Sequence, residues 1–213
     1  MTRRLSIASS YAKPSYVYMD IGAGHGYLSI DLERKGFKVY AVENKIGPFK
    51  ILEDSIKENN SNVECLYADG LDNMPSDVNG CFLLGMGAST MEEILFKDLN
   101  KLNKLEVIIL EPQTDCYNLF KKLYEYGYYD DIGCYVFEKH HYPLMRFVKG
   151  KSDIEYNEFD YMFGHYPLYN KDEVLKEKLE NNISNLNKII KSGVKGKENE
   201  LNKYVEALKI WNK

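Results

Sequence analysis

Three glycines alternate with other residues in the segment 18–28, directly after a short apolar run. Gly22, Gly24 and Gly26 let the backbone approach a ligand closely, and the amides of such a turn point toward the ligand where a helix begins. In the dinucleotide fingerprint G-x-G-x-x-G the third glycine would stand at Tyr27, so the spacing here is different. The segment predicts a nucleotide-type cofactor site, although a glycine-rich turn without any ligand has the same pattern.

The residue that ends the apolar run indicates which cofactor fits. Asp20 faces the turn, where its carboxylate would repel a pyrophosphate and attract an ammonium group. S-adenosylmethionine carries an ammonium group and no phosphate, so we expect it as the cofactor, with a different cofactor as the alternative. His25, inside the turn, either caps the following helix or touches the cofactor.

Acidic residues also end the next two predicted strands. Glu43 stands 23 residues after Asp20, where an acid can bind ribose hydroxyls, and Asp69 is placed to accept from an adenine amino group. A lone acid at a strand end is usually a helix cap, but three in register beside a glycine turn indicate a ligand site. The predicted cofactor-binding residues are Asp20, Gly22, Gly24, His25, Gly26, Tyr27, Glu43, Asn44, Asp69, Gly70, Gly85 and Met86.

The ends of the fourth and fifth strands indicate the kind of methyl acceptor. Methylation of an adenine amine would need a polar-Pro-Pro-aromatic tetrapeptide after the fourth strand, and residues 85–88 read Gly-Met-Gly-Ala. A ring nitrogen such as adenine N1 has an in-plane lone pair and no proton to lose, so alignment can replace a general base. Glu111 and Gln113, after the fifth strand, are the candidate catalytic residues; Pro112 between them also fits a simple strand terminator.

The elements that must position these residues alternate between strands and helices from 16 to 150, as in a doubly wound parallel sheet. The expected strands are 17–21, 38–42, 63–67, 82–84, 107–110, 131–138 and 143–148, and the expected helices are 27–35, 47–59, 89–96 and 114–126, with a short lead helix within 1–13. No helix separates the last two strands, so they should form an antiparallel hairpin. The fold class is therefore α/β, a Rossmann-like seven-stranded sheet typical of class I methyltransferases.

Apolar residues recur at helical spacing in the last part of the chain, on both sides of two Gly-containing breaks. This pattern predicts a coiled-coil-like helical hairpin at 169–213 after a cofactor-binding domain at 1–168. Residues 1–170 carry a net charge of −7 and residues 171–213 a net charge of +3. Basic residues near the hairpin tip and in the lead helix are either RNA contacts or a solvated surface; they are Lys188, Lys191, Lys195, Lys197, Arg3 and Arg4.

Composition limits the remaining possibilities. The 213 residues suffice for one α/β domain with an appendage, and 44% of them are hydrophobic. The four cysteines lack a C-x-x-C pair, the histidines lack metal-ligand spacing, and no apolar run could span a bilayer. We therefore expect a cytoplasmic monomer with reduced cysteines, no metal and no membrane contact.

Several short motifs together resemble one family along the whole chain, the bacterial tRNA adenine-22 N1-methyltransferases (TrmK). The similar segments are Arg4-Leu5, Asp20-Ile21-Gly22 with His25 and Tyr27-Leu28, Glu43 with Gly47-Pro48-Phe49, Asp69-Gly70-Leu71, Gly85-Met86-Gly87, Leu110-Glu111-Pro112-Gln113, and Gly164 with Pro167-Leu168. The resemblance implies S-adenosylmethionine as methyl donor, N1 of adenine 22 in tRNA as acceptor, and a hairpin that contacts RNA shape.

The chain departs from the family pattern at a few positions. Gly24 stands where many members have Asp, Ser29 replaces Pro, and Ala88 replaces Gly. Glu111 replaces Gln, and Gln113 replaces Asn. Gln113 keeps the side-chain amide but places it one methylene further from the backbone. Two alternatives therefore stay open: a methyltransferase of a small molecule or protein, and a non-catalytic RNA-binding module of the same fold.

Overall fold

One seven-stranded sheet runs through the structure, a computed structural model that describes residues 2–213. The strand order is β3-β2-β1-β4-β5-β7-β6; β1 to β5 are parallel, and β7 runs antiparallel to both β5 and β6. The strands are β1 (Val17–Ile21), β2 (Lys38–Glu43), β3 (Glu64–Tyr67), β4 (Gly80–Met86), β5 (Val107–Pro112), β6 (Tyr128–Phe137) and β7 (His141–Lys149). The predicted α/β fold with a closing antiparallel hairpin is confirmed.

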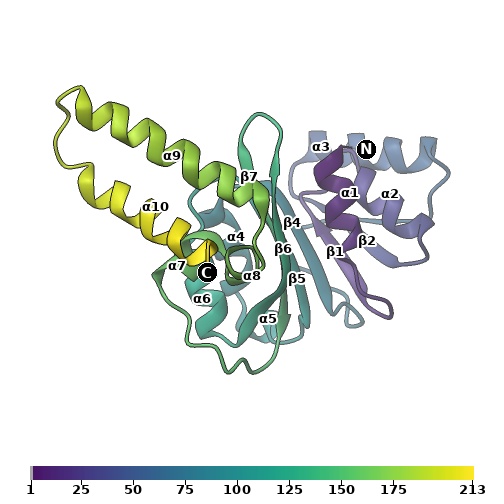
Figure 1. Cartoon of the computed structure of the whole chain (residues 1–213). Coiled ribbons are helices and arrows are strands. Elements are labelled where there is room, and N and C mark those ends of the chain that lie inside the picture. The colour runs from purple at the N-terminus through teal and green to yellow at the C-terminus, as the bar shows by residue number, and fades with distance from the viewer. Residues whose placement is uncertain (1) are drawn as a thin grey trace.

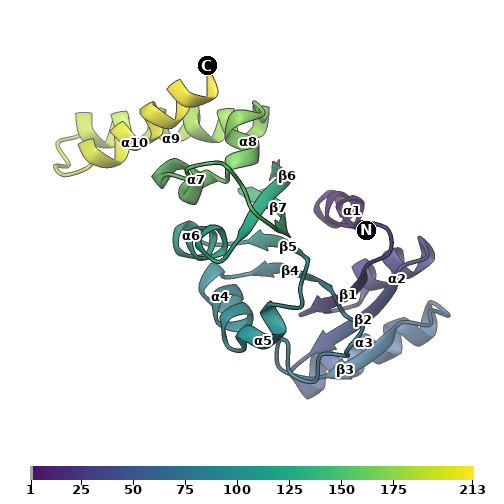
Figure 2. The same ribbon diagram turned by 90° about the horizontal axis from the view of Figure 1, so that it is seen from below.

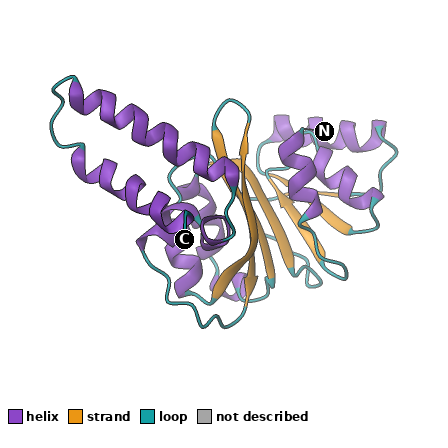
Figure 3. Ribbon diagram, viewed as in Figure 1, coloured by secondary structure: helices purple, strands orange, loops and turns teal. Residues whose placement is uncertain are grey.

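Helices cover both faces of this sheet (Figures 1 and 3). The helices α1 (Arg3–Ser10), α2 (Tyr27–Arg34) and α3 (Ile46–Glu58) lie on one face, and α4 (Ala88–Phe96), α5 (Leu99–Leu102) and α6 (Tyr117–Glu125) lie on the other, as Figure 2 shows. Buried strand runs such as Val107–Pro112 are apolar because both of their faces are covered. The sheet therefore presents its strand ends, and not its faces, to a ligand.

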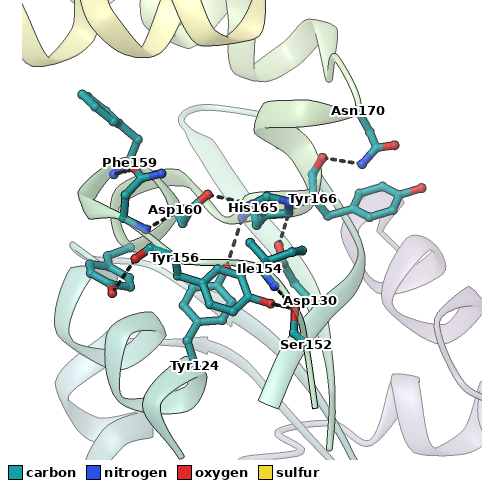
Figure 4. Close-up of polar contacts among 12 residues, drawn as sticks. Tyr124, Asp130, Ser152, Ile154, Tyr156, Phe159, Asp160, His165, Tyr166 and Asn170 are labelled. Carbon is teal, nitrogen blue, oxygen red and sulfur yellow. Dashed lines mark hydrogen bonds and ion pairs between the residues drawn. The ribbon is translucent and has the colours of Figure 1, made fainter. Parts of the chain in front are cut away.

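Two short helices connect the sheet to the C-terminal hairpin: α7 (Glu158–Phe163) and α8 (His165–Tyr169). Buried carboxylates hold them in place (Figure 4). Asp130 on β6 accepts a 2.6 Å hydrogen bond from Tyr166 N, and Asp160 Oδ1 lies 2.8 Å from His165 Nδ1. Tyr124 Oη accepts from His165 N at 3.1 Å. This polar network fixes the base from which the hairpin extends.

The hairpin consists of α9 (Glu173–Lys191) and α10 (Glu198–Trp211), close to the predicted bounds. Its base is part of the main hydrophobic cluster through Leu175, Leu179 and Trp211. The indole Nε1 of Trp211 donates to the carbonyl oxygen of Asp172 at 3.0 Å, which ties the end of α10 to the start of α9. The tip of the hairpin points away from the sheet (Figure 1).

Some expected boundaries were wrong. The helix expected at 114–126 begins only at Tyr117, after an Asp115 carboxylate that accepts from Tyr117 N at 3.0 Å. The lead helix expected within 1–13 is confirmed at Arg3–Ser10, with Thr2 as its cap, and Met1 lies outside the described residues. The sequence interpretation did not include α5, α7 or α8.

Candidate functional site

The glycine turn between β1 and α2 has the conformation that its sequence predicts. Gly22 and Gly26 have φ values of +75° and +69°, where side chains are strained. A Cβ on Gly26 would lie 2.7 Å from Leu52 Cδ1, so α2 could not pack this closely against α3 with any larger residue. Gly24 N donates to Glu43 Oε1 at 2.7 Å, which joins the turn to the end of β2.

Asp20 lies beneath this turn and is 4% exposed. Its Oδ2 accepts a 2.6 Å hydrogen bond from the Ser29 hydroxyl at the start of α2. Burial raises the pKa of Asp20 to about 6, the Ser29 hydrogen bond opposes this shift, and the nearby Glu43 carboxylate adds to it. Asp20 is thus a buried acid beneath the turn, and its protonation depends on burial, on Ser29 and on Glu43.

A cavity of about 420 Å³ opens at the carboxyl ends of β1, β2 and β4. The structure brings six of the predicted cofactor residues together in its wall: Gly22, Glu43, Asn44, Asp69, Gly70 and Met86. The other six lie around the turn or strand end without lining the cavity: Asp20, Gly24, His25, Gly26, Tyr27 and Gly85. His25 and Tyr27 stack their rings with centroids 5.5 Å apart, and the Tyr27 side chain is exposed.

The acidic rim of this cavity is partly neutralised by Lys97, a residue that the sequence did not single out. Asp69 Oδ1 accepts from Asn44 Nδ2 at 2.9 Å, and Lys97 Nζ lies 3.7 Å from the other oxygen of Asp69. The same ammonium lies 3.0 Å from Asp72. Lys97 follows directly after α4 in the chain, and no sequence pattern connects it with Asp69 or Asp72. The cavity can therefore accept a hydrogen-bond donor at Asp69 without leaving an isolated negative charge.

The ends of β4 and β5 are joined beside the cavity. Met86 pairs with Pro112 after an irregularity in the β4 strand, and Gln113 N donates to Met86 O at 2.9 Å. Ala88 N donates to the Thr114 hydroxyl at 2.9 Å. The Gln113 side chain is exposed at this junction, next to Gly85. The junction holds Gln113 at the carboxyl edge of the sheet, beside the end of β4.

Glu111, the other candidate catalytic residue, is 3% exposed and is engaged in an ion pair. Its Oε1 lies 2.7 Å from Arg4 Nη1, and Arg4 Nε lies 3.0 Å from Glu138 Oε2. The Arg4 guanidinium also covers the Tyr142 ring at 4.3 Å from its centroid. Burial raises the pKa of Glu111, and Arg4 opposes that shift. Arg4 thus already has two carboxylate partners, whereas Arg3 is exposed.

The four lysines predicted to contact RNA lie at or near the hairpin tip. Lys188, Lys191 and Lys195 are exposed, and Lys197 Nζ lies 2.7 Å from Glu200 Oε2. The structure places none of them in the wall of the 420 Å³ cavity.

The described residues contain no group of three or more His, Cys, Asp or Glu side chains arranged to hold a metal ion. The four cysteines are all free thiols. Within residues 2–213, we find no helix with the length and apolar character that crossing a membrane requires.

The sheet order, the antiparallel closing hairpin and the acid-rimmed cavity at the strand ends define a class I methyltransferase fold. The sequence model of the family "tRNA (adenine(22)-N(1))-methyltransferase", TrmK, matches residues 18–211. The chain belongs to this family, as its motifs predicted.

Individual relatives agree with this assignment. A tRNA (adenine(22)-N(1))-methyltransferase of Bacillus subtilis is 27% identical over 133 residues, which cover 60% of this chain and 56% of that protein, so the match spans little more than half of the relative. The structure of M. capricolum TrmK in complex with S-adenosyl-homocysteine has a TM-score of 0.86 at 23% identity and covers 99% of this chain and 98% of its own. The B. subtilis TrmK structure has a TM-score of 0.79 at 20% identity, and the match covers 100% of this chain and 97% of that chain.

Proposed function

We propose that the protein transfers a methyl group from S-adenosylmethionine to N1 of adenine 22 in tRNA. The family match over residues 18–211 carries this proposal. The structure supports it with a cavity whose size is ordinary for a cofactor site and whose wall offers acids for the ribose and adenine groups. In this proposal residues 1–168 form the catalytic domain, residues 169–213 form a tRNA-contacting hairpin, and the protein is a cytoplasmic monomer.

The proposed cofactor site uses the wall of the 420 Å³ cavity. Glu43 accepts from the ribose hydroxyls, Asp69 accepts from the adenine amino group, and Met86 lies close to the reactive end. The cofactor supplies an electrophilic methyl group on a sulfonium. A Cβ at Gly22 would lie 3.1 Å from Met86 Cε, so glycine avoids crowding the Met86 side chain in this wall. The other predicted cofactor residues shape the turn around this site.

The acceptor side requires alignment and no base. The adenine N1 lone pair forms the new bond to the methyl carbon, the carbon–sulfur bond breaks, and its electron pair stays on sulfur. The product base is positively charged, so negative and polar groups nearby favour it. Gln113 is placed to orient the base with its exposed amide, and Glu111 positions the strand end through Arg4.

Transfer of a labelled methyl group to an unmodified tRNA transcript tests the proposal, followed by nucleoside analysis of the product. We expect 1-methyladenosine at position 22 and no incorporation into the same transcript with guanine at that position. Binding of both cofactor and tRNA without transfer would instead support a non-catalytic RNA-binding module. Turnover on small molecules or proteins without RNA would support the other alternative.

A further inference from the structure

A second cavity of about 460 Å³ lies between the catalytic domain and the base of the hairpin. Its wall contains the end of β5, the start of β7, and side chains from both hairpin helices, including Lys178 of α9 and Tyr204 of α10. None of its lining residues is among those of the 420 Å³ cavity. Because both hairpin helices contribute side chains, this cavity depends on how the hairpin is attached to the sheet.

The two cavities meet the sheet at neighbouring strand ends. Met86 lines the first cavity, Pro112 lines the second, and these two residues are register partners on β4 and β5. Gln113, the exposed amide proposed to orient the acceptor base, also lines the second cavity. The second cavity therefore begins one strand away from the proposed methyl donor, on the side from which an acceptor can approach.

Lys178 is a cation in this wall without a counterion. Its Nζ lies 4.6 Å from the ring centroid of Tyr135 and 5.9 Å from that of Phe163, so aromatic faces support it. Among residues 2–213 no carboxylate oxygen lies within 4.0 Å of this ammonium. Burial lowers the pKa of Lys178, and the nearby Cys116 and Asp115 side chains oppose this shift without making an ion pair with the ammonium.

His141 adds a second polar group that lacks a partner. Its Nε2 is buried and makes no hydrogen bond to the described residues, although the residue lines the cavity at the start of β7. Buried polar atoms are normally paired, but this nitrogen is enclosed by the surrounding atoms and does not itself open into the cavity. Lys203 Nζ, in the same wall, is already 2.8 Å from Glu158, and the Asp115 carboxylate is engaged by Tyr117 N.

The chemistry of this wall fits an anion attached to a planar ring. An ammonium without an ion pair can bind a phosphate, and Tyr117 and Tyr204 offer aromatic surfaces for a base. The volume lies within the range of roughly 300–1,000 Å³ that is usual for sites of small ligands. Given the proposed tRNA substrate, on which this inference rests, the source of such a group is the RNA chain itself.

We propose that this cavity is an acceptor-side nucleotide site, in which Lys178 binds the phosphate of a tRNA nucleotide next to the target adenine, with His141 in the same wall. The base of the hairpin is then part of the substrate site, and the hairpin does more than extend basic residues away from the sheet. A single nucleotide held here would bring the adjacent base to Gln113 and the β4–β5 junction.

Binding of adenosine monophosphate to the full-length protein tests this site directly. S-adenosylhomocysteine is first added to saturation, so that the probe cannot occupy the 420 Å³ cavity. We expect adenosine monophosphate to shift the imidazole NMR signals of His141, assigned with His141→Gln, and adenosine without phosphate to bind at least about tenfold more weakly. Lys178→Gln should lose at least about tenfold in affinity for the monophosphate, while Lys178→Arg should retain most of it. Lys209→Gln, which removes an exposed hairpin charge paired with Glu206, is the matched control and should bind normally.

Steady-state methylation separates this site from the proposed function. For Lys178→Gln we expect the KM for tRNA to rise at least about tenfold with a smaller change in kcat and unchanged S-adenosylhomocysteine affinity. If the unsubstituted protein methylates tRNA but Lys178→Gln has the same KM and the same affinity for the monophosphate, the nucleotide site is wrong. If the unsubstituted protein does not methylate tRNA, the proposed function fails, and the monophosphate titration still decides whether this cavity binds a nucleotide.

Discussion

Arg4 Nη1 lies 2.7 Å from Glu111 Oε1, so the first helix of the chain is joined to the strand end that precedes Gln113. The same guanidinium reaches Glu138 at the end of the β6–β7 hairpin. Three segments that are distant in sequence therefore meet at one side chain. This relationship gives Arg4 a structural task in addition to the phosphate contact predicted from the sequence, which stays a prediction.

Replacing Arg4 by Met should destabilise the fold, because it leaves the buried Glu111 carboxylate without its cation. Removing one partner of a fully buried pair costs about 3–5 kcal/mol, and Arg4 is partly exposed, so we expect a loss of about 2 kcal/mol in the free energy of unfolding. Urea denaturation measures the loss. Adding Glu111→Gln to the Arg4→Met variant should recover most of it; a double variant as unstable as the single one would contradict the ion-pair explanation.

Asp69→Ala and Glu43→Ala should each weaken cofactor binding by about tenfold or more, since each removes an acceptor worth about 1.5–3 kcal/mol. Isothermal calorimetry with S-adenosylhomocysteine measures both affinities. Glu64→Ala, an exposed acid at the other end of the sheet, is the control and should bind normally. An unchanged affinity for Asp69→Ala would show that the adenine group is not held at Asp69.

The succession of strands along the chain and the positions of the acids at their ends could be predicted from the sequence, because both follow from local patterns. Local sequence patterns predicted the strand 17–21, the glycine turn and the helical hairpin, and the structure contains all three. The helices α7 and α8 are short, and a long-range contact, from Tyr166 N to the Asp130 carboxylate, holds them, so periodicity did not reveal them. The Asn157–Asp160 capping box at the start of α7 was a local signal that the sequence interpretation missed.

The same limit applies to the site. Glu43, Asp69 and Gly22 follow strand ends, so topology brings them to one cavity. The Arg4–Glu111 pair and the wall formed by Lys178 and His141 join residues that are far apart in the chain, and no spacing rule connects them. The sequence did contain one signal that Lys178 is buried. It stands three residues after Leu175 and directly before Leu179, on the apolar side of its helix.

Replacing Lys188, Lys191, Lys195 and Lys197 by Gln should lower tRNA affinity and its dependence on salt, with cofactor affinity unchanged. Because Lys197 is already paired with Glu200, we expect the slope of log affinity against log salt to fall by about 2–3, close to one per free lysine. Filter binding over a salt series measures the slope. A matched variant with Gln at the exposed Lys50, Lys57, Lys104 and Lys151 has the same charge change; equal slopes in both variants would mean that the hairpin tip is only a solvated surface.

The Asp130 carboxylate beneath α8 should make stability depend on pH (Figure 4). Burial raises the pKa of Asp130 to about 6, with the Tyr166 amide opposing the shift, whereas the ordinary value is about 3.9. The folded state therefore binds the proton more tightly, and the stabilisation present below about pH 4 is lost as the pH rises through 6.

Urea denaturation between pH 4 and pH 7 tests this effect. The free energy of unfolding should fall by about 2–3 kcal/mol more in the unsubstituted protein than in Asp130→Asn, from a shift of about two units at 1.36 kcal/mol each. Asp153→Asn, at an exposed position, should follow the unsubstituted protein. Parallel curves for Asp130→Asn and the unsubstituted protein would show that Asp130 titrates normally.

Trp211 is the single tryptophan of the chain. Its indole N–H donates a hydrogen bond to the carbonyl oxygen of Asp172 at the base of the hairpin, and the Lys176 ammonium lies 4.8 Å from the ring centroid. All tryptophan fluorescence of the protein therefore originates at the point where the hairpin joins the sheet. The emission of this one indole is a built-in optical reporter of that joint, which can be followed in stopped-flow mixing without attaching a dye.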